Sequence, residues 1–420
     1  MTAKRWFVFV LSLGLAMGFA LAQGVTITIA CGAVGQELEL CKEETAAWAA
    51  KTGNKVTVLE TPQLTNDRQG FYQQQLAAGS SDIDIYQIDV IYPGTLANFM
   101  IDLKPYVSAD ELKVQNQGII ANNTVGGKLV AMPWFTDGGV LYYRTDLMKK
   151  YGVAVPKTWT ELFAAAKKIQ DGERKAGKKD FYGFVFQGNA YEGLTCDALE
   201  WIASSGGGTI IDASGKVTIN NAKAAAILDL VASQIKLVSP PAVTTYDEEK
   251  ARGVFQSGNA AFMRNWPYAY SLGNQEGSAV KGKIGVAPLP AGPGGSNVGT
   301  LGGWQLAVSK FSKNPKVAAD LVRYLTGREV QKERAIKGSF QPTIPDLYKD
   351  ADVLKAVPFF KDLAGRQPVA RPSTVTGPKY GEVSAAFWSA VHDVLSGKSK
   401  AAAALAALEK KLNQIKGSGW

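Results

Sequence analysis

The sequence has 420 residues, of which 46% are hydrophobic, so it holds enough apolar material for two or three domains. Its formal net charge is +9, but the lysines and arginines occur as scattered pairs typical of solvated faces, which argues against a nucleic-acid partner. With one histidine and three cysteines, a His-rich metal site and a Ser-His-Asp triad are both disfavoured.

The N-terminus has the pattern of an export signal. A short positive region precedes an uncharged apolar stretch, 6–22, which ends in the small-residue pattern Ala20-Leu21-Ala22. We therefore predict a signal peptide over 1–22 and a periplasmic or otherwise extracytoplasmic location. An N-terminal membrane anchor is the alternative, although the stretch is marginal for a span of about 20 residues.

The first part of the exported chain alternates strands and helices. We expect strands over 25–30, 56–59 and 83–88, and helices over 37–52 and 68–78. This β-α-β-α-β order predicts a parallel sheet. Ligands of such sheets collect at the carboxyl ends of the strands, so Asp89, directly after the third strand, is a site candidate.

The remainder of the chain continues as an α/β protein. An extended apolar segment is expected over 131–144, and further strands over 284–290 and 304–308 flank a Gly/Pro-rich loop. Apolar spacing predicts helices in the following ranges: 160–170, 196–204, 222–236, 314–325, 380–395 and 400–415.

The three cysteines divide into a pair and a single residue. Cys31 ends the first strand and Cys41 lies ten residues later in the first helix, which makes them a disulfide candidate in an oxidising compartment. Closing so short a loop stabilises a fold by roughly 2–3 kcal/mol. Cys196 lies in an apolar helix, and we interpret it as a packed free thiol.

The common catalytic motifs are absent from the sequence, and only a pair of carboxylates is left to consider. The one histidine, His392, lies in a C-terminal helix, and no Gly-x-Ser-x-Gly or Cys-x-x-Cys motif occurs. We therefore expect no metal and no cofactor. The carboxylates of Glu37, Asp89 and Asp137 could converge, so a glycoside hydrolase, which needs only two carboxyl groups, remains the alternative.

Several stretches carry a specific resemblance to a known family. They are CGAVGQELEL at 31–40, PWFTDGGVLYYRTDLMKKYG at 133–152, FVFQGNAYEGLTCD at 184–197, RNWPYAY at 264–270, and KGKIGVAPLPAGPG with TLGGW at 281–304. In order and spacing these resemble the trehalose/maltose-binding proteins of ABC importers, within the maltose-binding-protein-like family. The resemblance implies a sugar receptor, not an enzyme.

The resemblance also implies the architecture. We expect a periplasmic-binding-protein-like fold of type II, in which two α/β lobes surround a ligand cleft and are joined by a multi-segment hinge. The N-lobe would take 24–136 plus 284–343, and the C-lobe 137–283 plus 344–420. The implied partners are a disaccharide and the permease subunits of an ABC importer, and we expect a monomer.

The positions that match the family's ligand contacts follow from the same resemblance. They are Glu37, Thr65, Arg68, Asp89, Asp137, Trp266, Tyr268, Gly303, Trp304 and Arg371. Carboxylates and arginine suit the vicinal hydroxyls of a sugar, and aromatic rings suit its C–H faces. Glu192 matches a family motif as a further candidate. Ordinary structural roles are the alternatives, such as a helix-terminal charge for Glu37 or a core position for Trp266.

Three functions are compatible with these observations. A transport receptor binds sugar without turnover. A hydrolase releases glucose. A ligand carrier for a chemoreceptor binds sugar, but its loss leaves uptake unaffected. Trehalose or maltose is the expected ligand, with sucrose a further possibility.

Overall fold

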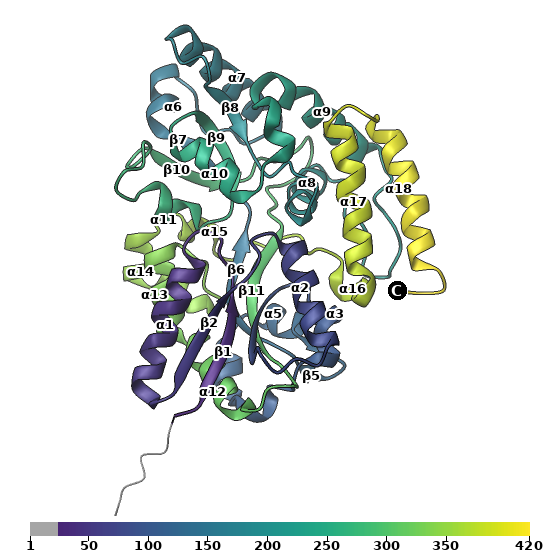
Figure 1. Cartoon of the computed structure of the whole chain (residues 1–420). Coiled ribbons are helices and arrows are strands. Elements are labelled where there is room, and N and C mark those ends of the chain that lie inside the picture. The colour runs from purple at the N-terminus through teal and green to yellow at the C-terminus, as the bar shows by residue number, and fades with distance from the viewer. Residues whose placement is uncertain (1–23) are drawn as a thin grey trace, which may run out of the picture.

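The computed structural model describes residues 24–420 and divides them into two α/β lobes (Figure 1). The expected signal peptide, 1–22, lies outside the described residues. Within 24–420, the longest apolar helices still fall short of what a membrane span requires. The disulfide between Cys31 and Cys41 is formed, with the two Cα atoms 6.6 Å apart, and Cys196 is a buried free thiol.

The N-lobe is built on a five-stranded sheet, counted within the described chain, with the order β2-β1-β3-β11-β6. The first three strands are parallel, as the β-α-β-α-β order predicts, whereas β11 runs antiparallel to both of its neighbours. The bounds are β1 Thr26–Cys31, β2 Lys55–Glu60, β3 Ile85–Asp89, β6 Met132–Gly138 and β11 Leu301–Val308, with a short hairpin of β4 Thr124–Val125 and β5 Lys128–Leu129.

The C-lobe is built on a second sheet with the order β10-β7-β9-β8. Its strands are β7 Val140–Arg144, β8 Tyr182–Val185, β9 Ala260–Asn265 and β10 Ile284–Pro288. The expected division assigns 284–288 to the N-lobe. In the structure these residues form β10, which pairs antiparallel with β7 in the sheet of the C-lobe. The chain therefore returns to the N-lobe after β10, and the expected boundary is wrong by one strand.

Helices cover both sheets. The N-lobe helices are α1 Glu37–Thr52, α2 Thr65–Ala77, α3 Pro93–Leu96, α4 Ala109–Lys113, α5 Gln117–Asn122, α12 Pro315–Leu325 and α13 Arg328–Gly338. The C-lobe helices are α6 Thr145–Tyr151, α7 Trp159–Lys175, α8 Glu192–Ser204, α9 Ala222–Val238, α10 Glu248–Gln256, α11 Ala269–Gly273, α17 Tyr380–Leu395 and α18 Ala401–Lys416. Between them come α14 Ala351–Ala356, α15 Phe360–Leu363 and α16 Ser373–Thr376, and single 3-10 turns (η1–η5) lie at Ala97–Phe99, Lys104–Tyr106, Pro241–Thr245, Pro345–Lys349 and Gly377–Lys379.

Local signals explain where these helices begin and end. Helix α1 ends at Gly53, whose left-handed backbone closes the last turn. Helix α7 begins with a capping box in which Thr158 and Glu161 satisfy each other's backbone N–H groups. Both signals can be recognised in the sequence. The first helix has its predicted range, whereas α7 begins one residue before its predicted start and continues five residues beyond its predicted end.

The hydrophobic cores do not follow the lobe boundary. One cluster fills the N-lobe and continues into one face of the second sheet, where it includes Val140, Tyr142 and Met263. A second cluster lies among α7, α8, α9, α17 and α18. The apolar interior is therefore continuous across the junction, so the two lobes are packed together.

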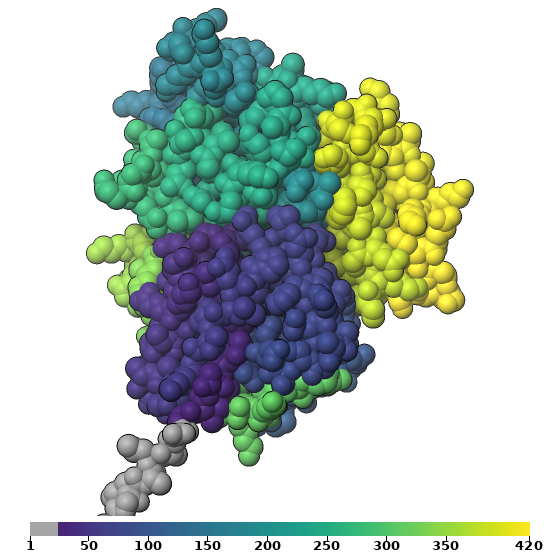
Figure 2. Space-filling view, viewed as in Figure 1, coloured from purple at the N-terminus to yellow at the C-terminus, as the bar shows by residue number. Residues whose placement is uncertain are grey.

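Three segments connect the lobes. The first is Gly138-Gly139, from the end of β6 to the start of β7, the second is 289–300 between β10 and β11, and the third is 364–372 after α15. Residues 345–363 pack on α13 and on β10, and thus on both lobes rather than on the C-lobe alone. In Figure 2 the C-terminal helices form a yellow layer beside both lobes, and α16 contacts α3 of the N-lobe.

Candidate functional site

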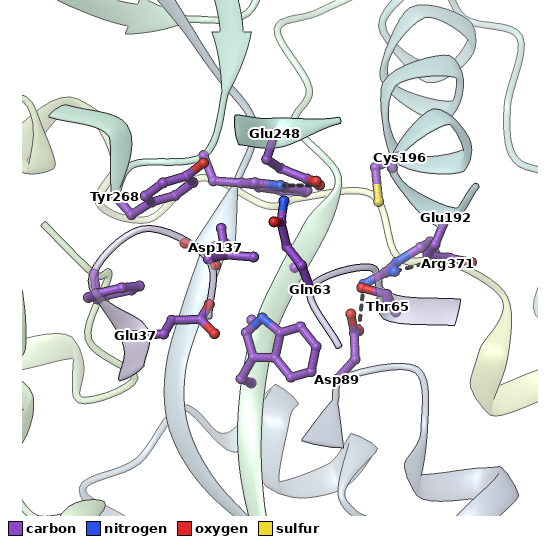
Figure 3. A pocket seen from close by; sticks show the side chains of 17 residues that line it. Glu37, Gln63, Thr65, Asp89, Asp137, Glu192, Cys196, Glu248, Tyr268 and Arg371 are labelled. Carbon is purple, nitrogen blue, oxygen red and sulfur yellow. Dashed lines mark hydrogen bonds and ion pairs between the residues drawn. The ribbon is translucent and has the colours of Figure 1, made fainter. Parts of the chain in front are cut away.

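A cleft lies between the lobes, next to the carboxyl ends of β1 and β3 (Figure 3). Its empty space is about 570 Å³, counting the part open to solvent. The lining residues are Val34, Glu37, Gln63, Thr65, Asp89, Asp137, Glu192, Gly193, Cys196, Glu248, Trp266, Tyr268, Gly302, Gly303, Trp304, Phe340 and Arg371.

Glu37 enters the cleft from the first turn of α1. The Gln87 side chain on β3 donates to its Oε2 at 3.1 Å, and the Gly32 N–H donates to Gln87 Oε1 at 2.6 Å. Glu37 is 3% exposed, and burial raises its pKa, while Arg68 and Gln87 oppose the rise. The carboxylate is therefore held rigidly at the carboxyl end of the sheet.

Asp89 ends β3, where the order of elements predicts a site residue. Its Oδ1 accepts from Arg371 Nη2 at 2.9 Å and from the Ile91 N–H at 3.2 Å. Arg371 also donates through Nη1 to Glu192 Oε1 at 2.9 Å. Since Asp89 belongs to the N-lobe and Glu192 to the C-lobe, the Arg371 side chain bridges the cleft, as Figure 3 shows.

Asp137 lies on β6 just before the first crossing segment. Its Oδ1 is buried and has no hydrogen-bond partner among residues 24–420. Burial raises its pKa well above the ordinary value, and the neighbouring carboxylates of Glu37 and Asp89 add to the rise. A buried acceptor without a partner costs free energy, so this oxygen is suited to accept a hydrogen bond from a ligand.

Trp266 and Tyr268 form an aromatic wall on the C-lobe side. The Arg264 guanidinium stacks over the Trp266 ring at 3.9 Å, and the indole N–H lies 3.4 Å from Glu248 Oε1. Arg264 is itself fixed by ion pairs with Asp197 at 2.8 Å and with Glu200 at 2.5 Å. One face of the indole is thus covered, which leaves the other for a ligand.

Trp304 lines the N-lobe side of the cleft and has a similar support. The Arg68 guanidinium stacks over its ring at 4.1 Å, and Arg68 Nε donates to the Pro62 carbonyl at 3.0 Å. Gly303, with a φ of 117°, precedes Trp304, and a Cβ there would lie 2.6 Å from the Phe135 carbonyl oxygen. Glycine therefore permits the close approach of β11 to β6 that positions Trp304.

The structure brings together all of the site residues expected from the sequence except Arg68. Arg68 is fully buried, stacks on Trp304 and does not line the cleft, so its expected contact with a ligand stays a prediction. Cys196, interpreted as a core thiol, is buried but also lines the cleft. Sequence reasoning missed other lining residues because they carry no distinctive local signal: Val34, Gln63, Gly193, Glu248, Gly302 and Phe340.

The chemistry of this cleft is that of recognition. Aromatic faces stand on both sides, and carboxylates and one arginine stand between them. Such a set can contact apolar faces and hydrogen-bond hydroxyl groups at the same time. Among the described residues, no three His, Cys, Asp or Glu side chains are placed to hold a metal ion together.

Comparison with known proteins also indicates a binding protein. The model of the bacterial extracellular solute-binding protein family matches residues 36–332. A Deinococcus radiodurans protein described as a probable ABC transporter-binding protein is 59% identical over 414 residues, which cover 97% of this chain and 98% of the relative. The arabinooligosaccharide-binding protein of Bacillus subtilis is 26% identical over 268 residues, which cover 60% of this chain and 58% of the relative.

Solved structures have the same two-lobe architecture. The structure described as maltose-bound T. maritima MalE3 is 40% identical, has a TM-score of 0.88, and is covered over 100% of its length by 93% of this chain. The fold is therefore the periplasmic-binding-protein-like fold expected from the sequence. These relatives are binding proteins rather than enzymes, so the hydrolase alternative is not supported. The chain belongs to the family of bacterial extracellular solute-binding proteins.

Proposed function

We propose that this protein is the sugar-binding component of an ABC importer and that it binds a neutral disaccharide, with trehalose or maltose as the leading candidates. The observation that carries the proposal is the pairing of Trp266 and Trp304, one from each lobe, around buried carboxylates. Stacking against sugar faces and acceptance of hydroxyl hydrogen bonds would occur together in one cleft. The choice of sugar is supported by the 40% identical T. maritima structure, which is described as maltose-bound.

A phosphorylated sugar fits this cleft poorly. Arg371 is the one cationic side chain that lines it in the described structure, and it is already paired with Asp89 and Glu192. A phosphate group would meet carboxylates with no free positive charge to offset the repulsion. The cleft therefore favours an uncharged ligand.

The proposed mechanism is capture by closure. Sugar would bind to one lobe of an open form, and rotation about the three connecting segments would enclose it. The closed monomer would then present the sugar to permease subunits in the membrane, which supports an extracytoplasmic location. The protein itself would make and break no covalent bond.

Calorimetry against trehalose, maltose, sucrose and glucose tests the proposal. We expect at least one disaccharide to bind more tightly than about 100 μM, roughly −5.5 kcal/mol, and glucose to bind more weakly. A glucose assay on the same mixtures should detect no release. If none of the four sugars binds, or if a disaccharide is cleaved, the proposed function is wrong.

A further inference from the structure

Glu192 lines the cleft, but its carboxylate is committed to other protein groups. Oε1 accepts from Arg371 Nη1 at 2.9 Å and also from the Tyr380 hydroxyl. Oε2 accepts from Ser384 Oγ at 2.6 Å, and Ser384 Oγ in turn lies 2.7 Å from Thr195 Oγ1. Three donors thus surround a side chain that is only 3% exposed, so little acceptor capacity is left for a ligand.

Arg371 depends on these contacts for its position. It lies in the third connecting segment, where Val369 exchanges backbone hydrogen bonds of 2.9 Å with Gly299 and Leu301. From there its side chain reaches Glu192 on one side and Asp89 on the other, both at 2.9 Å. A long, flexible arginine loses rotamer freedom when it is held in one geometry, and two buried carboxylates provide that restraint.

We propose that Glu192 is a positioning residue, which fixes Arg371 between the lobes and acts on the ligand only through Arg371. The inference rests on the proposed function, because it concerns how the same cleft binds sugar. Helix α17 contributes to this positioning, because the hydroxyl groups of Tyr380 and Ser384 hold the Glu192 carboxylate on the C-lobe side. Helix α17 is thereby linked to the cleft although none of its residues lines it.

The ordinary alternatives make different predictions. If Glu192 binds sugar directly, the losses from removing Glu192 and from removing Arg371 multiply. If Glu192 is only a packing element, its removal lowers thermal stability and leaves sugar affinity unchanged. If Glu192 acts through Arg371, its removal weakens binding in the natural background and has no further effect once Arg371 is gone. A double-mutant cycle separates the three.

The cycle consists of Glu192→Gln, Arg371→Gln and the double variant, titrated with whichever of trehalose or maltose the unmodified protein binds. We expect Glu192→Gln to weaken binding roughly tenfold, the range for loss of a hydrogen bond to a charged group. The double variant should bind within about twofold of Arg371→Gln alone. Multiplied losses, or an unchanged Kd for Glu192→Gln, would overturn the inference.

A matched control removes a different buried glutamate from the same lobe. Glu173 on α7 has no exposed side-chain surface and pairs with Lys150 and Lys178, away from the cleft. Glu173→Gln should lower the melting temperature and leave the sugar Kd unchanged. A general loss of C-lobe stability is thereby distinguished from a loss of Arg371 positioning.

The design remains decisive if Glu192→Gln fails to fold. Ser384→Ala then replaces it in the cycle, because this change removes the donor that holds Glu192 Oε2 and so loosens the carboxylate that fixes Arg371. Weaker binding that depends on Arg371 supports the inference, and unchanged binding contradicts it. Failure of the unmodified protein to bind any of the sugars would instead refute the proposed function.

Discussion

Trp266 combines a cleft-lining face with a charged support. Arg264 stacks on one side of its ring at 3.9 Å, and the ring is only partly buried. Trp266→Ala should weaken disaccharide binding by about 1–3 kcal/mol, the value for burying a large apolar side chain, while the fold persists. Calorimetry gives the affinity and circular dichroism the fold. An unchanged Kd would assign Trp266 to packing alone.

Asp137 is the residue whose charge state ought to respond to the ligand. Burial raises its pKa, the carboxylates of Glu37 and Asp89 add to the rise, and the charges of Arg264 and Arg334 oppose it. A sugar hydroxyl that donates to the unpartnered oxygen favours the ionised carboxylate, so the pKa falls on binding. Sugar binding therefore releases protons at pH values between the Asp137 pKa of the sugar-bound protein and that of the free protein. Sugar affinity rises with pH across that interval.

The variant Asp137→Asn should abolish this proton release. Calorimetry in two buffers of different ionisation enthalpy measures it directly, and equal enthalpies for the unmodified protein would contradict the prediction. The same residue predicts a stability effect of opposite sign. Because the folded pKa lies above the ordinary 3.8, the folded state binds more protons and loses stability as pH rises through the folded pKa.

Asp137→Asn lacks this loss. Without sugar it should therefore be more stable than the unmodified protein near pH 8 and equally stable near pH 4. Each rise of one in the pKa corresponds to about 1.4 kcal/mol of this difference. Thermal unfolding at both pH values checks the sign.

At the scale of elements, Gly139 in the first connecting segment has a specific packing role. A Cβ there would lie 2.0 Å from Glu200 Oε1 and 2.6 Å from Arg264 Nη2. Glu200 cannot easily yield, because it is fully buried, pairs with Arg264, and accepts the Thr300 N–H of the second connecting segment at 3.0 Å. Glu200 thus ties the second connecting segment to the support of the aromatic wall and leaves no room for a side chain at Gly139 in the first.

Gly139→Ala should therefore destabilise the protein by about 1–3 kcal/mol, as overpacking does. Sugar binding should weaken as well, because Arg264 is displaced beneath Trp266. Gly138→Ala is the matched control, since the nearest atom to its new Cβ would be Gln341 Oε1 at 3.8 Å. Equal melting temperatures for the two variants would show that position 139 accommodates a Cβ without strain, which would contradict the prediction.

Elements differ in how far the sequence alone predicts them. The helix at 37–52 and the position of Asp89 follow from local periodicity and from the order of elements, and the structure has both. The membership of β10 depends on pairing with β7 across a long stretch of chain, which no local pattern encodes. Arg68 lies where expected on α2, but the direction of its side chain depends on Trp304, which is remote in sequence.

At the scale of the whole molecule, contacts between lobes are polar at the cleft and apolar behind it. Arg371 bridges the lobes, the Ser271 hydroxyl of the C-lobe donates to Gln36 Oε1 at 3.1 Å, and the main apolar cluster is continuous through the junction. The structure is therefore a closed form. Affinity for a ligand enclosed between the lobes includes the free energy of closure, so residues that never touch the ligand can alter it.

Asn66 is such a residue. Its Oδ1, on α2 of the N-lobe, accepts the Glu192 N–H at 2.9 Å, so one lobe satisfies a free donor at the start of a helix in the other. The bond exists only when the lobes meet. Asn66→Ala should shift the unliganded protein towards the open form and weaken sugar binding by about 1 kcal/mol, roughly fivefold in Kd.

Loss of folding cannot explain such an effect, because alanine is the better helix former at this position. The exposed Asn98 of the same lobe supplies the control, and Asn98→Ala should leave the Kd unchanged. Small-angle scattering should give a larger radius of gyration for unliganded Asn66→Ala, and saturating sugar should return it to the value of the unmodified protein. An unchanged radius together with an unchanged Kd would mean that closure does not depend on this bond, and that the free energy of closure resides in the Arg371 bridge and the apolar junction.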